Sequence, residues 1–222
     1  MYLTHLLFAS LVAAAITDAG STTKTKNETH TDAWKTVSQN ETFYIMYRSY
    51  EYDAGTGGTG KCVSVKLCEK NNTTRTATSR IMYRDAQTTQ LMGVTARVTM
   101  ARSWNSTVDD IIRLGNADNC NAPTNAATAE YRLVYSDYTT CDVMVGYGTL
   151  EPKCELWIKD GKQKHLDNNT LKANNDTFKA RSNEDDSAIK NKITKCEQEY
   201  KKLCQVKYQI YDKLICSSPG AN

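Results

Sequence analysis

Eight cysteines are the feature that most limits how this chain can fold. They are Cys62, Cys68, Cys120, Cys141, Cys154, Cys196, Cys204 and Cys216. In an oxidising compartment an even number of cysteines predicts a framework of up to four disulfides. Zinc is the rival use of clustered cysteines, but the sequence has no Cys-x-x-Cys pair and its three histidines are isolated. We therefore expect disulfides and no metal site.

The amino-terminal segment supports export. An apolar run over residues 6–16 is followed by small residues, and it is shorter than the roughly 20 residues of a transmembrane helix. The sequence thus predicts a signal peptide over residues 1–19 and a secreted, extracellular protein with no membrane segment. Seven Asn-x-Ser/Thr sequons predict glycosylation at Asn27, Asn40, Asn71, Asn72, Asn105, Asn168 and Asn175.

The pattern of the rest indicates a single β domain over residues 32–222, preceded by a flexible arm over residues 20–31. Runs rich in Val, Tyr, Thr and Ile predict strands near 42–51, 61–68, 78–84, 91–100, 107–113, 130–137, 141–147 and 153–159. After a polar stretch over 160–187, the apolar stripe of an amphipathic helix consists of Ile189, Ile193, Cys196, Tyr200, Leu203 and Cys204. We predict an all-β fold, an eight-stranded antiparallel barrel with a C-terminal α-helix packed on the outside. A β-sandwich is the alternative.

Several function classes are disfavoured. The net charge of +3 comes without a basic stripe, so we expect no nucleic-acid partner. The segment from Gly55 to Cys62, GTGGTGKC, approaches a phosphate-binding loop, but the residues after it alternate like a strand where that motif needs a helix. We expect a flexible hairpin loop there and no cofactor. No nucleophile, base and acid form a recognisable set, so we do not expect an enzyme.

Two adjacent predicted strands carry acids inside apolar runs. Strand side chains alternate between faces. Asp142 therefore points to the opposite face from Cys141, while Glu155 and Trp157 share one face of the next strand. If the cysteine-bearing faces meet the helix, these three side chains point into the barrel. A buried carboxylate needs a partner. That partner is either a ligand cation covered by Trp157, or an internal base such as Arg97.

These elements resemble the tick salivary lipocalins, specifically the histamine-binding group. The resemblance rests on Cys141-Asp142-Val143, Glu155-Leu156-Trp157, Cys196, Asp32-Ala33-Trp34-Lys35, the segments 43–53 and 61–65, and Tyr135-Ser136-Asp137. It spans roughly residues 32–216. It implies the disulfides Cys62–Cys216 and Cys141–Cys196, and leaves Cys68, Cys120, Cys154 and Cys204 to pair in any of three ways. It also implies amine contacts at Tyr50, Asp53, Asp142, Glu155 and Trp157.

The chain departs from the family pattern at several positions. Expected acids align with Ala96 and Tyr131, and the Gly/Thr loop replaces an aromatic after Asp53, so we expect one amine site centred on Glu155 and Trp157. Tyr50 and Asp53 are an odd number of residues apart, so both face inward only if the strand bends or bulges.

The resemblance implies a protein that sequesters a small host mediator, a biogenic amine such as histamine or serotonin. By default we expect a monomer, with a small-molecule ligand as its partner. Two alternatives remain. One is a scavenger of a leukotriene or a fatty-acid-like mediator, for which an inward Arg97 would meet the ligand carboxylate. The other is a lipocalin that binds a host protein such as a complement component.

Overall fold

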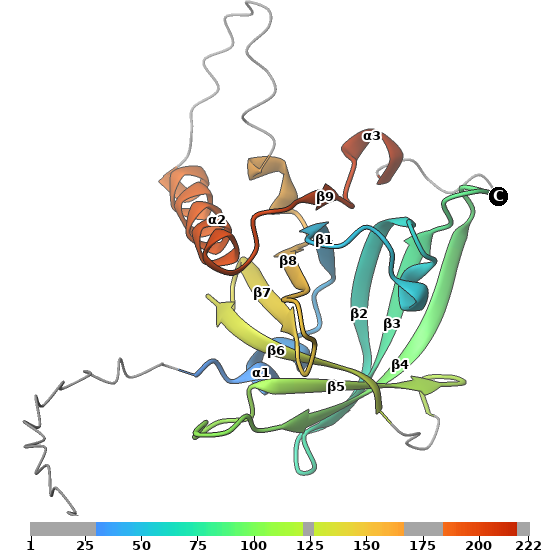
Figure 1. The fold of residues 1–222 in the computed structure, drawn as a ribbon, viewed down its shortest axis with the longest axis vertical. Helices are drawn as coiled ribbons and strands as arrows, with labels where there is room; N and C mark the ends of the chain where they lie inside the picture. The colour runs from blue at the N-terminus through green and yellow to red at the C-terminus, as the bar shows by residue number, and fades with distance from the viewer. Residues whose placement is uncertain (1–29, 122–126, 167–183, 217–222) are drawn as a thin grey trace, which may run out of the picture.

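The computed structural model describes residues 30–121, 127–166 and 184–216 of the chain (Figure 1). The predicted signal peptide, most of the predicted arm, and the sequons Asn27, Asn168 and Asn175 lie outside these residues. The long strands are β1 (Phe43–Arg48), β2 (Lys61–Asn71), β3 (Thr76–Arg84), β4 (Leu91–Ala101), β5 (Ile111–Ala117), β6 (Ala127–Ser136), β7 (Cys141–Gly146) and β8 (Cys154–Lys159). All eight predicted strands are present.

The strands form one closed antiparallel sheet. From β2 to β7, each strand pairs with the next one along the chain, and β8 pairs with both β7 and β1. The barrel closes where β1 pairs with β2, through Phe43 opposite Val65 and Tyr44 opposite Ser64. The structure therefore confirms the eight-stranded antiparallel barrel and excludes the sandwich.

Two strand boundaries differ from the prediction. The strand predicted near 107–113 begins at Ile111, because Asp109 and Asp110 instead accept hydrogen bonds at the end of the barrel. The Asp109 carboxylate lies 2.5 Å from Arg75 Nη1, and Asp110 Oδ1 lies 2.7 Å from the backbone N of Ser103. The strand predicted over 42–51 ends at Arg48, after a bulge between Ile45 and Tyr47.

A short helix, α1 (Ala33–Val37), covers one end of the barrel. The Asp32 side chain caps it by accepting a hydrogen bond from the backbone N–H of Trp34 at 3.1 Å. Trp34 is 8% exposed and packs among residues of several strands, including Val98 and Ile112. The end where α1 lies is thereby filled with apolar side chains.

The second helix, α2 (Glu184–Leu203), packs on the outside of the barrel against β7 and β8 (Figure 1). Its buried residues include Ile193, Cys196 and Tyr200, as the apolar stripe predicts, whereas Leu203 is 45% exposed. The helix begins within the stretch 160–187 that we expect to be loop, and that stretch also contains η2 (Gln163–His165). Two further short elements, β9 (Tyr208–Gln209) and α3 (Lys213–Cys216), follow without any signal that we recognised.

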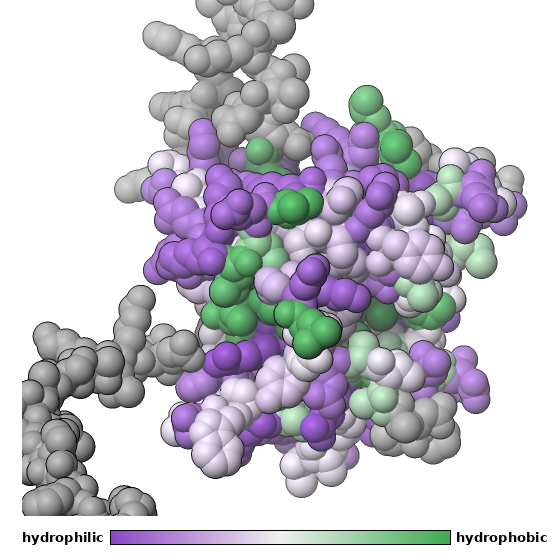
Figure 2. Space-filling model, viewed as in Figure 1, coloured by the Kyte–Doolittle hydropathy of each residue, from purple (hydrophilic) through white to green (hydrophobic). Residues whose placement is uncertain are grey.

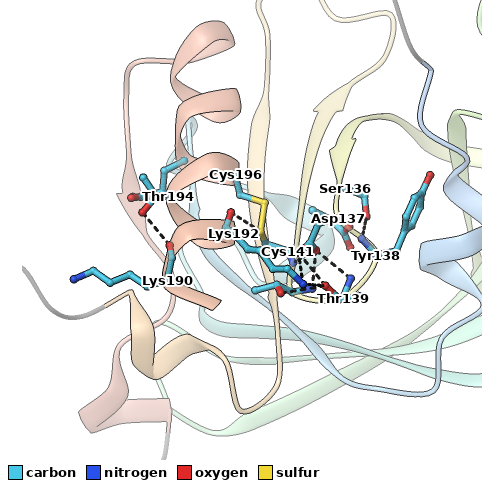
Figure 3. Close-up of a disulfide and its surroundings, with 12 residues drawn as sticks. Ser136, Asp137, Tyr138, Thr139, Cys141, Lys190, Lys192, Thr194 and Cys196 are labelled. Atoms are coloured by element: carbon cyan, nitrogen blue, oxygen red, sulfur yellow. Dashed lines mark hydrogen bonds and ion pairs between the residues drawn. A yellow bond between two sulfur atoms is a disulfide. The ribbon is translucent and has the colours of Figure 1, made fainter. Parts of the chain in front are cut away.

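All eight cysteines are paired. The pairs are Cys62–Cys216, Cys68–Cys120, Cys141–Cys196 and Cys154–Cys204. The first and third are those that the resemblance implies. The third joins α2 to the start of β7, and the fourth joins the residue directly after α2 to the start of β8. Figure 3 shows the Cys141–Cys196 bridge beside the turn that leads into β7. Each bridge contributes about 2–4 kcal/mol to stability by restricting the unfolded chain.

The surface is mainly polar. Figure 2 shows hydrophilic residues over most of one face, with hydrophobic residues in a few separate patches. The largest exposed apolar side chains include Trp104, Leu150 and Leu214. Within the described part of the chain, no helix is long and apolar enough to cross a membrane.

Candidate ligand-binding site

Strands β7 and β8 place acids on one face and cysteines on the other. Asp142 lies opposite Trp157 in the register, and Met144 lies opposite Glu155. These four side chains line the barrel interior. The alternate residues, among them Cys141 and Cys154, pack outward against α2. The alternation of the two strands thus puts Asp142, Glu155 and Trp157 inside the barrel.

The barrel encloses a cavity of about 120 Å³. One water needs about 10–15 Å³ on this scale, so the cavity has room for one small organic molecule. Its walls are mostly apolar. They include Phe43, Ile45, Val65, Leu67, Ile81, Val98, Ile112 and Leu114.

Four carboxylates interrupt these apolar walls. They belong to Glu41, Asp53, Asp142 and Glu155. Among the described residues that line the cavity, none is Lys, Arg or His. A small apolar cavity whose ionisable lining is entirely acidic favours a ligand with a positive charge and a hydrophobic body.

Glu155 is the more fully bonded of the two acids on β7 and β8. It is 3% exposed, and its Oε2 accepts a hydrogen bond from Trp157 Nε1 at 2.8 Å. Its Oε1 accepts a hydrogen bond from the Tyr50 hydroxyl. Burial raises the pKa of Glu155 to about 7, even though these two bonds favour the carboxylate. A ligand cation at this position would compensate the charge that burial disfavours.

Asp142 lies toward the end of the cavity that α1 covers. It is 1% exposed, and its Oδ1 accepts a hydrogen bond from Thr36 Oγ1 at 3.3 Å. Its Oδ2 is buried without a hydrogen-bond partner. Burial raises the pKa of Asp142 to about 7. An unpartnered oxygen beside a cavity can accept a hydrogen bond from a bound ligand.

The turn before β7 fixes where Asp142 stands. Asp137 Oδ1 accepts hydrogen bonds from the backbone N–H groups of Thr139, Thr140 and Cys141, at 3.0, 2.7 and 3.1 Å (Figure 3). Burial alone would raise the pKa of Asp137, but these three donors lower it by more, so the carboxylate is favoured. The turn is thereby held rigidly next to the acid.

Tyr50 and Asp53 reach the site from the segment after β1. The chain leaves the sheet at Arg48, so neither residue follows strand alternation. Asp53 lines the cavity and caps η1 (Ala54–Thr56), because its Oδ1 accepts a hydrogen bond from Gly55 N at 2.8 Å. Tyr50 reaches the site through Glu155, and its hydroxyl also lies 3.4 Å from Asp53 Oδ2. No bulge is needed to bring the two residues together.

Arg97 is not the partner of Glu155. Ala96 and Val98 line the cavity, so Arg97 between them points to the other face of β4. Its Nη2 donates to Thr76 Oγ1 at 3.1 Å. Glu155 is bonded to Tyr50 and Trp157 instead.

The GTGGTG segment forms a turn that leads into a strand, as the alternation of the following residues predicts. It contains the η1 turn, and the residues that follow form strand β2. The phosphate-binding interpretation is therefore excluded, since no helix begins at Lys61.

Sequence reasoning missed five polar residues in the cavity wall, Thr36, Gln39, Glu41, Thr56 and Ser79. Four of them lie on α1, on η1 or in the turn before β1, where neither alternation nor helical period applies, and Ser79 lies on β3. Tyr131, which stands where an acid was expected, also lines the cavity, and the nearby Glu155 carboxylate raises its pKa. Over the described residues, His, Cys, Asp and Glu side chains form no group of three that could hold a metal ion.

Comparisons of the sequence with known proteins point to one family. The family model "Tick histamine binding protein" matches residues 21–217. A male-specific histamine-binding salivary protein from Rhipicephalus appendiculatus is 28% identical over 136 residues, 59% of this chain and 64% of that relative. The chain thus matches a little under two thirds of the relative's length.

Two solved structures match the chain at low sequence identity. A structure named as an AM182 serotonin complex has 16% identity, a TM-score of 0.43, and coverage of 86% of this chain and 95% of its own. The cockroach allergen Per a 4 has 17% identity and a TM-score of 0.39, over 57% of this chain and 68% of its own. The family model covers nearly the whole chain, and the chain belongs to the tick histamine-binding protein family.

Proposed function

We propose that this protein is secreted and sequesters a biogenic amine, histamine or serotonin, inside the barrel. One observation carries the proposal: among the described residues, the lining groups that can carry a charge near neutral pH are all carboxylates. The ammonium group would meet Glu155, and the aromatic ring of the ligand would lie against Trp157 and the apolar wall. The unpartnered oxygen of Asp142 would accept a second hydrogen bond from the ligand.

A scavenger works by stoichiometry and needs tight binding, and a nanomolar Kd corresponds to about −12 kcal/mol. An ion pair in a dry cavity, its hydrogen bonds and an aromatic contact can together supply much of that. A lipid acid is disfavoured, because its carboxylate would face Glu155 and Asp142 without a basic partner among the lining residues.

Calorimetric titration of the oxidised protein tests the proposal. At pH 8 we expect submicromolar binding of histamine or serotonin. Glu155→Gln should weaken binding at least about tenfold, because it removes the charge that meets the ammonium group. Glu130→Gln is the control, since Glu130 lies on β6 and pairs with Arg113.

The affinity should also depend on pH with a definite sign. The Glu155 carboxyl has a pKa of about 7 in the free protein, so below that pH it must lose a proton to bind a cation. We expect binding to weaken about tenfold between pH 8 and pH 6. Unchanged affinity in Glu155→Gln would contradict the proposal. A heat of binding with a leukotriene but not with amines would favour the lipid alternative. No heat of binding with any of these ligands would favour a protein partner.

A further inference from the structure

Arg48 is a buried base at the edge of an acidic site. It is the last residue of β1, its register partner on β8 is Glu155, and its side chain has no exposed surface. A buried guanidinium group is costly unless its N–H groups are bonded. Its hydrogen bonds therefore show what it holds.

The hydrogen bonds and the ion pair of this guanidinium go to the segment 50–58. The contacts are Nε to Tyr50 O at 3.0 Å, Nη1 to Thr56 Oγ1 at 3.0 Å, Nη2 to Glu51 O at 2.7 Å and to Gly58 O at 2.8 Å, and Nη1 to Asp53 Oδ2 at 3.7 Å. The planar, five-donor group thus reaches both ends and the middle of one short segment.

That segment carries three residues of the site. Tyr50 bonds to Glu155, and Asp53 and Thr56 line the cavity. Within the segment, backbone hydrogen bonds link Asp53 with Gly58, but these bonds are internal to it. Arg48 is anchored in the sheet, so its side chain fixes the segment relative to the barrel.

We propose that Arg48 is the positioning residue of the amine site: it holds the segment 50–58 over Glu155 so that Tyr50, Asp53 and Thr56 take their places around the ligand. The part concerning the ligand rests on the proposed function. The part concerning the segment stands on the contacts alone.

Arg48 also acts on Glu155 by charge. Its positive charge lowers the pKa of Glu155 against the larger effect of burial. The charged or titratable groups that face or influence Glu155 are Arg48 on β1, Tyr50 and Asp53 in the segment, Tyr131 on β6 and Tyr200 on α2. A residue that served packing alone would not shift the titration of Glu155.

Amide hydrogen exchange tests the positioning role without any ligand. The amides of Thr56 and Gly58 bond to Asp53 O at 3.2 and 2.7 Å. In Arg48→Gln we expect them to exchange at least about tenfold faster, while the amides of β3 and β4 are unchanged. Arg97→Gln is the control, because Arg97 lies on the outer face of β4. If Arg48→Gln does not fold, Thr56→Val removes one acceptor of Arg48 and gives the same comparison.

A conservative variant separates the hydrogen bonds of the guanidinium group from its positive charge. Arg48→Lys keeps the positive charge but cannot reach Tyr50 O, Glu51 O and Gly58 O together. We expect Trp157 fluorescence to report the protonation of Glu155, with Trp157→Phe confirming the source of the signal. The midpoint should rise in Arg48→Gln and return toward wild type in Arg48→Lys, whereas amide exchange stays fast in both.

Amine affinity completes the test. We expect Arg48→Gln to weaken binding at least about tenfold and Arg97→Gln to leave it unchanged. If the wild type binds no amine, the proposed function fails, and amide exchange still decides whether Arg48 holds the segment. Unchanged exchange of the Thr56 and Gly58 amides in Arg48→Gln would overturn the inference. It would also be overturned if the amine affinity of Arg48→Gln and the midpoint of its Glu155 titration both matched those of the wild type.

Discussion

Asp142 stands in a folded environment that disfavours its charge. Its pKa is raised from 3.8 to about 7 by burial, so the folded protein binds this proton more tightly than the unfolded chain does. As the pH rises from about 4 through 7, the folded state therefore loses stability relative to the unfolded state. A side chain of the same shape that cannot ionise would not show this loss.

We predict that Asp142→Asn raises the free energy of unfolding of the ligand-free protein at pH 8. The gain should be about 2–4 kcal/mol and should shrink as the pH is lowered to about 4. Urea unfolding at both pH values, with the disulfides intact, measures it.

Asp137→Asn is the matched control with the opposite sign. Its pKa is lowered in the folded state, so its carboxylate stabilises the fold at pH 8, and this contribution is lost as the pH falls. If Asp142→Asn is less stable than the wild type at pH 8, the charge of Asp142 must be stabilised by partners in the folded protein, and the prediction is wrong.

At this scale the sequence predicts side chains on strands better than side chains elsewhere. The alternation of β7 and β8 places Asp142, Glu155 and Trp157 inside because the period of a strand is two. Arg48 was missed. It ends an apolar run and could have been noticed as a base next to buried positions, but three of its partners are backbone carbonyls, which no pattern of residue types reveals.

At the scale of elements, the segment 50–58 depends on glycine. Gly57 has φ +73°, and a Cβ added there would lie 2.2 Å from Cε2 of Tyr83. Gly148 in the β7–β8 turn has φ +74°, but an added Cβ would have no atom within 4 Å. An alanine at either position would have the same unfavourable left-handed backbone, but only at Gly57 would its Cβ clash with a neighbouring side chain.

We predict that Gly57→Ala lowers amine affinity at least about tenfold, because the added methyl group would clash with the Tyr83 ring and relief of the clash would displace the segment that carries Asp53, unless the ring moves instead. Both Gly57→Ala and Gly148→Ala should lose about 1 kcal/mol of stability to the left-handed backbone. Calorimetry at pH 8 gives the affinities. Equal affinities in the two variants would mean that the segment tolerates displacement.

The elements themselves were predictable where the residue pattern is regular. The Val- and Tyr-rich runs gave all eight strands, and the stripe of Ile193, Cys196 and Tyr200 gave the core of α2. The start of β5 was misplaced because the pairing of Asp109 with Arg75 is a tertiary contact. The helix α1 is five residues long and depends on the Asp32 cap, so it is too short for a helical repeat of apolar residues to predict it.

At the scale of the whole molecule, the sequons within the described residues gather at one end of the barrel. Asn40 lies between α1 and β1, Asn71 and Asn72 lie at the β2–β3 turn, and Asn105 lies between β4 and β5, all exposed. These turns meet around α1, since Arg75 pairs with both Asp109 and Asp32. The segment 50–58 lies at the opposite ends of the strands.

We predict that sugars at these positions leave ligand entry unhindered. Protein produced in a eukaryotic secretory host should carry sugar at that end, and enzymatic removal should leave the amine Kd within about twofold. Peptide mass spectrometry gives the occupied sites, and calorimetry before and after removal gives the affinities. A large gain in affinity on removal would place the entry route at the α1 end.

The alternation of β7 and β8 has a consequence for how such a protein can diversify. Cys141 and Cys154, which tie the strands to α2, stand directly beside Asp142 and Glu155 but face the opposite way. Residues that line the cavity and residues that fasten the strands to the outer helix therefore alternate one position apart. A substitution at an inward position changes the cavity wall and leaves both disulfides in place.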